Sequence, residues 1–330
     1  MANNPEQPQE SVTVSCRFCG AMNRFSTERA LLDLQKVICG QCKGKLLRVS
    51  GEPLTDLRNE HIAHPWDREA LAKLKAIPYL EQILGKLLGS TFDKLQRFNH
   101  LGSGIRVDAR QAPRLHKLYL EAAGRIDVDP PPLFLVQRPD VNAYTTGAAQ
   151  PLVAVTTGLV DLMSDREILG VLGHELAHVK LGHVLMRTVA ILVANGALAL
   201  LNLAGLAQLA LGPLKMVLFK WYQMSELSAD RGELVATGSL TTHIRTHMML
   251  AGGSTKLADE LDVAAFVDQA NDAEAMRDSE LFVSIMEMLS GSQRSHPLVV
   301  WRVHHAINWA RTQAFYDVLA GAPGSRPLIP

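Results

Sequence analysis

The 330-residue chain has few aromatic residues and no excess of either charge. Phe, Trp and Tyr make up 5% of it, and 33 Lys and Arg residues balance 33 Asp and Glu residues. A net charge of zero provides no electrostatic steering toward polyanions, which argues against nucleic acid as a partner. Hydrophobic residues make up 47%, enough for a large core, and abundant Ala and Leu favour a helix-rich fold.

The N-terminus lacks a secretory signal, because residues 1–10 are polar and rich in Pro, Asn and Gln. We therefore expect a cytoplasmic protein in a reducing compartment. Cysteine is also scarce, and its four residues form two C-x-x-C pairs with a 19-residue spacer between them. Paired thiols at this spacing favour a metal over a disulfide framework in such a compartment. The sequence predicts a structural zinc bound by Cys16, Cys19, Cys39 and Cys42.

This cysteine-containing segment also resembles the zinc-binding N-terminal extension of some bacterial thioredoxins. No further C-x-x-C pair remains for redox chemistry, so the resemblance extends to the zinc ribbon alone. Such a ribbon could bind a substrate or partner protein, contact nucleic acid, or cap the fold. Its Lys and Arg residues make it basic, but Phe18 and Phe25 are its only aromatic residues, so we favour protein recognition.

Residues 174–178 form an H-E-x-x-H motif within a segment that has helical periodicity. Residues four apart share a helix face, so His174 and His178 can bind one metal ion together. Glu175 lies about 100° further round the helix, where its carboxylate can take a proton from a zinc-activated water. A capping box at residues 164–167 marks the start of the helix. The alternative is a hydrogen-bonded pair of core histidines.

A catalytic zinc needs a third protein ligand and an open position for water. Glu226 and Asp230 are four residues apart in a second helical segment, so both carboxylates project from one face. We assign Glu226 as the metal ligand and Asp230 as the carboxylate that orients a ligating histidine. Taken alone, this pair is also typical of a solvated acidic face. His183 is a competing ligand, but it lies roughly 140° away from the His174 and His178 face.

H-E-x-x-H followed, after a long apolar segment, by E-x-x-x-D resembles the HtpX-like family of zinc metallopeptidases, which includes the CAAX-prenyl endopeptidases. Residues 142–147 look like its N-A-[FY]-x-x-G segment, and residues 153–161 are similar to the strand and turn before its active-site helix. Residues 295–297, followed by Arg302, resemble its [ST]-H-P element. The resemblance covers roughly residues 105 to 315. It implies a gluzincin with zinc on His174, His178 and Glu226, and Glu175 as general base and later proton donor.

Two further site interpretations follow from these segments. Asn142, Ala143 and Tyr144 lie in a predicted edge strand that could hold a peptide substrate by strand addition. An ordinary hairpin is the alternative. His296 could donate a hydrogen bond to the oxyanion that forms when water attacks the peptide carbonyl. Its alternative is a core or helix-capping histidine.

Residues 188–214 carry no charge and are long enough to suggest a transmembrane span. His178 and Glu226 flank this segment and must reach the same zinc, so the chain would have to cross a membrane twice. Two crossings need roughly 40 residues, more than are available. We expect an apolar helical insert that meets a membrane surface at the cytoplasmic face, with burial in the fold or an oligomer interface as the alternative. Integral-membrane relatives carry earlier spans, whereas residues 70–100 here predict an amphipathic surface helix.

The predicted fold is α+β and mainly helical, with a small sheet. We expect a flexible tail at 1–14, a zinc ribbon at 15–50, a linker at 51–69, a metallopeptidase domain at 70–318 and a tail at 319–330. Helices are predicted at 112–125, from Ser164, at 261–270 and at 298–314, and strands at 133–137 and 151–157.

The leading functional hypothesis is a zinc endopeptidase that acts on protein or peptide substrates, with protein quality control as a role suggested by family analogy. The alternative is a non-catalytic or latent zinc protein that binds partners through its ribbon. Glu175 favours the enzyme, because a scaffold has no need of a general base.

Overall fold

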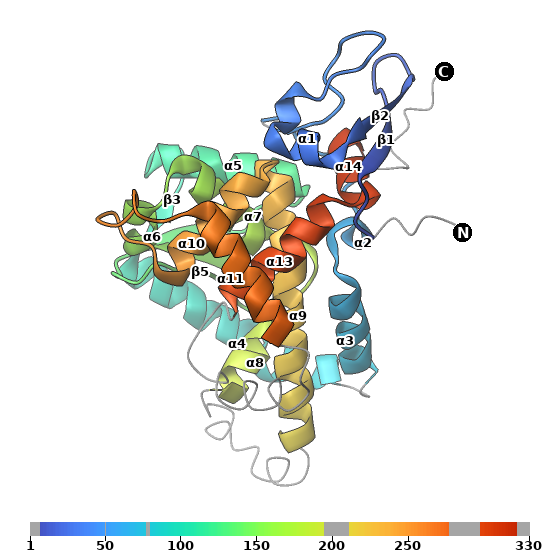
Figure 1. The fold of residues 1–330 in the computed structure, drawn as a ribbon. Coiled ribbons are helices and arrows are strands. Elements are labelled where there is room, and N and C mark those ends of the chain that lie inside the picture. The colour runs from blue at the N-terminus through green and yellow to red at the C-terminus, as the bar shows by residue number, and fades with distance from the viewer. Residues whose placement is uncertain (1–6, 50, 77–79, 195–210, 277–297, 322–330) are drawn as a thin grey trace, which may run out of the picture.

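The computed structural model describes residues 7–49, 51–76, 80–194, 211–276 and 298–321. In these ranges the chain is mainly helical, with a two-stranded and a four-stranded sheet. The N-terminal module lies at one end of a larger helical domain (Figure 1). The predicted α+β, mainly helical fold class is confirmed.

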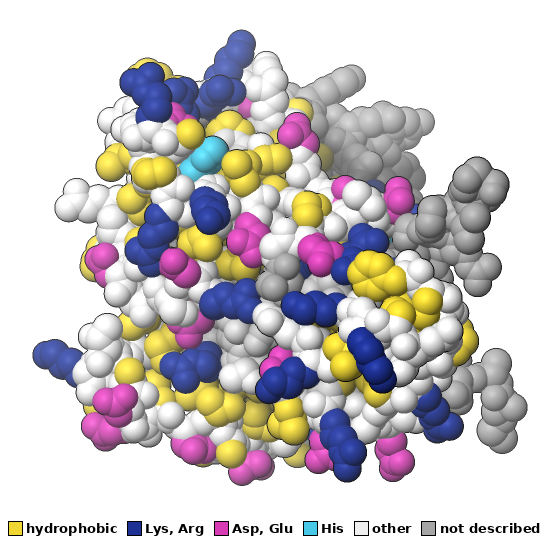
Figure 2. All heavy atoms as spheres, turned by 90° about the horizontal axis from the view of Figure 1, so that it is seen from above, with side chains coloured by type: hydrophobic (Ala, Val, Ile, Leu, Met, Phe, Trp, Pro, Cys, Tyr) yellow, Lys and Arg dark blue, Asp and Glu magenta, His cyan; other side chains and the backbone are white. Residues whose placement is uncertain are grey.

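The N-terminal module is built on a hairpin of β1 (Ser11–Ser15) and β2 (Met22–Ser26), followed by α1 (Thr27–Leu32) and a 3-10 helix at Leu34–Lys36. Val12 and Val14 alternate with polar residues and bury one face of the hairpin. On the face seen in Figure 2, basic, acidic and apolar side chains are intermixed.

Both expected tails contain ordered structure. Strand β1 begins at Ser11, and the Gln9 amide donates a hydrogen bond to the Arg311 carbonyl at 2.9 Å. Helix α14 (Gln313–Gly321) runs into the other expected tail and packs on β1. Tyr316 and Leu319 of α14 are fully buried. The segments around β1 and α14 therefore pack against each other, which neither segment predicts by itself.

The larger domain contains a sheet in the order β3-β4-β6-β5. Its strands are β3 (Gly104–Val107), β4 (Leu133–Val136), β5 (Ala143–Thr146) and β6 (Leu152–Thr156). Strands β4 and β6 are parallel, while β3 and β5 pair antiparallel at the two outer positions. Every residue of β6 is buried, and β5 alternates buried and partly buried residues. Strand β5 is therefore an outer strand with one face on the core.

Helices α7 (Asp165–Lys180) and α9 (Leu211–Thr237) form the centre of this domain. They approach closely because glycines lie at the contact. A Cβ on Gly173 would lie 2.3 Å from Ala236 Cβ, and one on Gly232 would lie 2.4 Å from Ala177 Cβ. The small residues thus bring the backbones of the H-E-x-x-H and E-x-x-x-D helices together.

The remaining helices surround this pair (Figure 1). Their bounds are α2 (Asn59–Ile62), α3 (Pro65–Lys75), α4 (Leu80–Ser103), α5 (Pro113–Ile126), α6 (Thr157–Leu162), α8 (Val184–Ala194), α10 (Leu240–Gly252), α11 (Val263–Met276) and α13 (Val299–Ala310).

Three predicted segments differ from the structure. The expected linker at 51–69 contains α2 and the start of α3, because Pro65 occupies the first turn of a helix, where its missing N–H costs nothing. The single helix expected at 70–100 is instead α3 and α4, and α4 is kinked at Gly89, whose φ is 32°. The helix expected at 298–314 ends at Ala310, before α14 begins.

The apolar insert at 188–214 lies partly in α8 and the start of α9, and residues 195–210 are outside the described part of the chain. Among the helices that the structure describes, none combines the length and apolar character needed to cross a membrane.

Candidate metal centre

Helix α7 begins with the predicted capping box. The Ser164 amide and hydroxyl donate to Glu167 Oε2 at 2.8 and 2.7 Å, which satisfies polar groups at the helix start. Two turns later, His174, Glu175 and His178 are all buried. Buried ionisable groups are costly unless something pairs with them, so their partners define the site.

Glu226 of α9 lies opposite the two histidines. His174 Nε2 is 3.5 Å from Glu226 Oε2, and His178 Nε2 is 3.4 Å from Glu226 Oε1. Two ligands of a tetrahedral zinc at about 2.1 Å lie roughly 3.4 Å apart. The three side chains therefore have the spacing of a metal-ligand set, and all three lie close enough together to hold one ion.

Asp230 lies one turn after Glu226, on the other side of His174. Its Oδ1 is 3.1 Å from His174 Nδ1, and the other ring nitrogen, Nε2, faces Glu226. Arg302 of α13 donates from Nε to Asp230 Oδ2 at 2.7 Å. Burial would raise the pKa of Asp230, but the Arg302 guanidinium holds it well below its usual value. Asp230 is thus a carboxylate that orients His174.

His178 has an equivalent support that the sequence did not predict. Its Nδ1 is 3.1 Å from His183 Nδ1, and His183 Nε2 is 3.1 Å from Asp67 Oδ2. Gly182, with a φ of 71°, turns the chain back after α7, so that His183 lies behind His178. Asp67 is buried in α3, within the segment expected to be a linker. Burial, reinforced by Arg187, lowers the pKa of His178 well below its usual value, which favours the neutral ring that a metal requires.

Two buried arginines contact Glu226. Arg187 of α8 donates from Nη1 to Glu226 Oε1, and Arg302 donates from Nη1 to Oε2 at 2.8 Å. Both side chains are almost inaccessible to solvent. They balance the buried carboxylates, which would otherwise be strongly destabilising. The family resemblance included Arg302, whereas no local pattern indicates Arg187.

Strand β5 contributes a partner for Glu175. The Thr145 hydroxyl donates to Glu175 Oε2 at 2.7 Å, and both residues are buried. Ala143, two residues earlier on the same face, lines a small cavity together with His174 and Glu175. Tyr144 points to the opposite face of the sheet, where its hydroxyl lies 3.0 Å from His100 Nε2. Asn142 donates its amide to the Thr156 hydroxyl at 3.1 Å. Of the three predicted substrate-binding residues, Ala143 lines the site and the Tyr144 side chain lies on the opposite face of the sheet.

The predicted oxyanion donor, His296, lies outside the described residues, as do residues 295 and 297.

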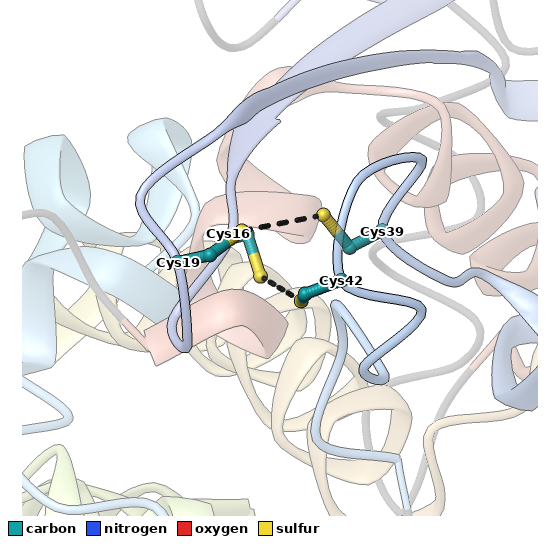
Figure 3. Close-up of side chains that lie close together, drawn as sticks. All are labelled: Cys16, Cys19, Cys39 and Cys42. Carbon is teal, nitrogen blue, oxygen red and sulfur yellow. Dashed lines mark hydrogen bonds between the residues drawn. The ribbon is translucent and has the colours of Figure 1, made fainter.

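The four cysteines form a second group that could hold a metal (Figure 3). Cys16 Sγ is 3.5 Å from Cys42 Sγ, and Cys19 Sγ is 3.6 Å from Cys39 Sγ. Thiolates that share a tetrahedral zinc at about 2.3 Å lie roughly 3.8 Å apart. Hydrogen bonds from backbone amides, first that of Cys42, lower the pKa of the Cys39 thiol to about 6, despite its burial. All four cysteines are free thiols, and their geometry is that of a zinc ribbon.

Comparison with known proteins places the chain among metallopeptidases. Residues 109–310 match the model of peptidase family M48. The plastoglobule-localized metallopeptidase 48 of Arabidopsis thaliana is 32% identical over 81% of this chain and 77% of its own length. An HtpX protease homolog of Burkholderia lata is 28% identical over 63% of this chain and 78% of its own length.

A third relative, an HtpX protease homolog of Ralstonia pickettii, is 31% identical over 40% of this chain and 54% of its own length. No solved structure matches the chain. The predicted resemblance to HtpX-like metallopeptidases is confirmed by the family match, which extends over the helices that carry His174, Glu226 and Arg302. The chain therefore belongs to peptidase family M48.

Proposed function

We propose that this chain is a zinc-dependent endopeptidase that hydrolyses peptide bonds in protein or peptide substrates. The observation that carries the proposal is the convergence of His174, His178 and Glu226 beside Glu175. They come from two different helices, and His178 and Glu226 are 48 positions apart in the sequence. Two core histidines in a structural role would have no need of a third ligand at this spacing or of an adjacent buried carboxylate.

We assign His174, His178 and Glu226 as the residues that would hold the zinc. The His178 Nε2 atom is buried and has no hydrogen-bond partner, which suits a nitrogen that keeps its lone pair for a metal. A zinc ion bound here would supply Lewis acidity, which polarises the scissile carbonyl and makes a water acidic enough to react near neutral pH. Asp230 and His183 hold the two imidazoles in the required orientation.

Glu175 is the residue that moves the proton in this proposal. Its carboxylate takes a proton from the attacking water and later delivers it to the leaving amine. The Thr145 hydroxyl occupies one lone pair of Oε2 and so holds the carboxylate in a single orientation. This contact also links the catalytic base to strand β5, along which we propose that the substrate binds.

We propose that the substrate is an extended or unfolded polypeptide. Strand β5 is an outer strand of its sheet, and Ala143 of β5 lines the same cavity as Glu175. A peptide that is added alongside an outer strand uses its own backbone hydrogen bonds for binding, which folded proteins do not offer. Removal of unfolded proteins in quality control is consistent with such a substrate.

We also propose that Cys16, Cys19, Cys39 and Cys42 bind a structural zinc. All four ligand positions of a tetrahedral ion are then taken by thiolates, which leaves no open position for catalysis. Phe18 and Leu32 are largely exposed, at 62% and 84% of their full accessible surface. This exposure favours a second candidate function, in which the ribbon docks a partner protein and the peptidase domain is latent.

The test is hydrolysis of casein by the wild-type chain and by Glu175→Gln, with zinc counted in both proteins. We expect the variant to keep its zinc and to lose activity by about 10²- to 10⁴-fold, the usual contribution of a general base. Equal activity in both proteins would exclude Glu175 as the base. Full zinc content without activity in either protein would favour the latent or scaffold function.

A further inference from the structure

A second group of buried histidines and carboxylates lies beside the candidate catalytic centre. His243 and His247 are one turn apart on α10, and Asp230 and Glu233 are nearly one turn apart on α9. Each pair therefore presents its side chains toward the other helix. The exposed fractions are 0% for both histidines, 2% for Asp230 and 1% for Glu233. Apart from Asp230, the proposed mechanism uses none of these four residues.

The side chains of this group lie close enough together to share an ion. His247 Nε2 lies 3.6 Å from Asp230 Oδ1, and His243 Nδ1 lies 2.9 Å from Glu233 Oε2. One donor atom from each of Asp230, His243 and His247 falls within 4.8 Å of the other two. Two ligands of a tetrahedral zinc lie roughly 3.4 Å apart, so an ion fits between these side chains with little movement.

The hydrogen bonds within this group show which of its atoms are available to bind a metal ion. His247 Nδ1 lies 3.1 Å from the His243 carbonyl oxygen, and because a carbonyl can only accept, the hydrogen is on Nδ1. When the His247 ring is neutral, its Nε2 lone pair then faces Asp230 Oδ1, an oxygen that also carries lone pairs. His247 Nε2, His243 Nε2 and Glu233 Oε1 are buried without a hydrogen-bond partner. Two acceptors held this close need a cation or a proton between them.

The charges around the group also leave room for a cation. Asp230 and Glu233 contribute two negative charges, and Arg302 contributes one positive charge through its contacts with Asp230. The Glu233 carboxylate faces the imidazoles of His243 at 2.9 Å and His247 at 3.8 Å. Its buried negative charge must therefore be balanced by a protonated histidine or by a bound cation. A cavity of about 20 Å³, lined by Glu233, Thr246 and His247, opens between this group and the catalytic residues. That volume holds about one water molecule, which could complete the coordination of an ion.

We propose that His243 and His247, with the carboxylates of Asp230 and Glu233, bind a divalent metal ion, zinc by the preference of its ligands. The ion would be separate from the proposed catalytic and ribbon zincs. It would tie α10 to α9 and would share the Asp230 carboxylate with Arg302. Because Asp230 also orients His174, occupancy of this site would be coupled to the geometry of the catalytic ligands.

The experiment is a zinc count on the full-length chain after reconstitution with excess zinc and removal of loosely bound metal by gel filtration. We expect three zinc ions per wild-type chain, one for each group: the catalytic set, the cysteines and the histidine pair. His243→Asn and His247→Gln should each bind one fewer. His116→Asn, at a histidine of α5 that belongs to no such group, is the matched control and should keep all three.

Thermal unfolding with and without added zinc separates loss of the site from loss of the fold. We expect zinc to raise the melting temperature of both histidine variants by less than that of wild type, with their cysteine-bound zinc retained. A wild-type count of two would overturn the proposal and indicate that a protonated histidine pairs with the carboxylates instead. A third zinc that persists in both histidine variants would overturn it as well.

Discussion

At the scale of single residues, the candidate active site depends on partners that hold each reactive group in one orientation. Glu175 is held by Thr145, His174 by Asp230, and His178 by His183. Each contact joins buried groups, in which an unmet hydrogen bond is expensive. Removing one such partner should therefore alter catalysis or metal affinity without removing a catalytic residue.

Thr145→Val tests this idea at Glu175, the proposed general base. Without the hydroxyl, the Glu175 carboxylate loses the hydrogen bond that orients it, and we expect kcat to fall roughly ten- to hundredfold. Steady-state kinetics on casein, together with a zinc count that stays unchanged, would measure the effect. Thr146→Val is the matched control, because its side chain points to the opposite face of β5. Equal losses in both variants would mean that the strand, rather than the hydroxyl, is responsible.

His64 predicts a pH dependence of stability. It caps α3 by accepting a hydrogen bond from the Trp66 amide on Nδ1 at 3.2 Å, and burial, with Arg231 nearby, lowers its pKa to about 2. The folded chain keeps His64 neutral, while the unfolded chain protonates it near pH 6.5. Its contribution to stability is therefore complete above pH 6.5 and declines as the pH falls below that value.

The measurement is urea unfolding of wild type and His64→Asn between pH 7 and pH 4. Asn preserves a helix cap but does not titrate. We therefore expect the free energy of unfolding of His64→Asn to depend less steeply on pH than that of wild type. The difference in slope should correspond to the uptake of up to about one proton on unfolding. Identical slopes for the two proteins would contradict this role of His64.

At the scale of elements, the contact between α7 and α9 positions all the proposed zinc ligands. Gly173 and Gly232 permit that contact, because a methyl group at either position would overlap an alanine of the other helix. We expect Gly173→Ala to destabilise the chain by about 1–3 kcal/mol through overpacking, and to weaken zinc binding as the helices separate.

Gly102→Ala provides the control for this prediction. Gly102 lies in α4, and a Cβ there would meet no atom within 4 Å. Replacing it should leave stability unchanged or raise it by up to about 1 kcal/mol, since alanine favours helix. Chemical denaturation of both variants measures the difference. A Gly173→Ala protein as stable as wild type would show that the two helices can move apart at no cost.

At the scale of the whole molecule, the ribbon and the peptidase domain share one core. Val12, Cys16 and Cys39 belong to the same hydrophobic cluster as Leu172 and Phe315. The Arg48 amide donates to the Leu319 carbonyl at 2.7 Å, and Phe25 packs edge-on against Tyr316 with ring centroids 5.4 Å apart. We therefore expect the two parts to unfold together.

Cys39→Ser tests this coupling, because it removes a buried ligand of the proposed ribbon zinc. We expect the variant to bind one zinc fewer and to unfold in a single transition at a lower melting temperature than wild type. Calorimetry with a parallel zinc count would show this. Two separate transitions, with the upper one at the wild-type temperature, would instead mean that the ribbon folds independently of the peptidase domain.

Much of the architecture followed from local sequence patterns. The capping box located the start of α7 within one residue, and the strands expected at 133–137 and 151–157 match β4 and β6 within one residue at each end. The start of β1, the end of α14 and the start of α3 were mispredicted, because polar and Pro-containing stretches are typical of tails and linkers unless distant residues pack on them. The buried positions of Val12 and Leu319 depend on each other's segments, and neither segment carries that information alone.

The sequence by itself determined the groups whose members are close along the chain. His174 and His178 share a face because of helical periodicity, and each C-x-x-C pair can converge because of a short turn. The tertiary structure alone decided which distant groups meet these residues. Thr145 reaches Glu175, Asp67 reaches His183, and His247 reaches Asp230 only after strands and helices have packed. Spacing along the chain specifies local geometry. A buried charge, however, needs a partner, and residues that are distant in the sequence become partners only when the core packs.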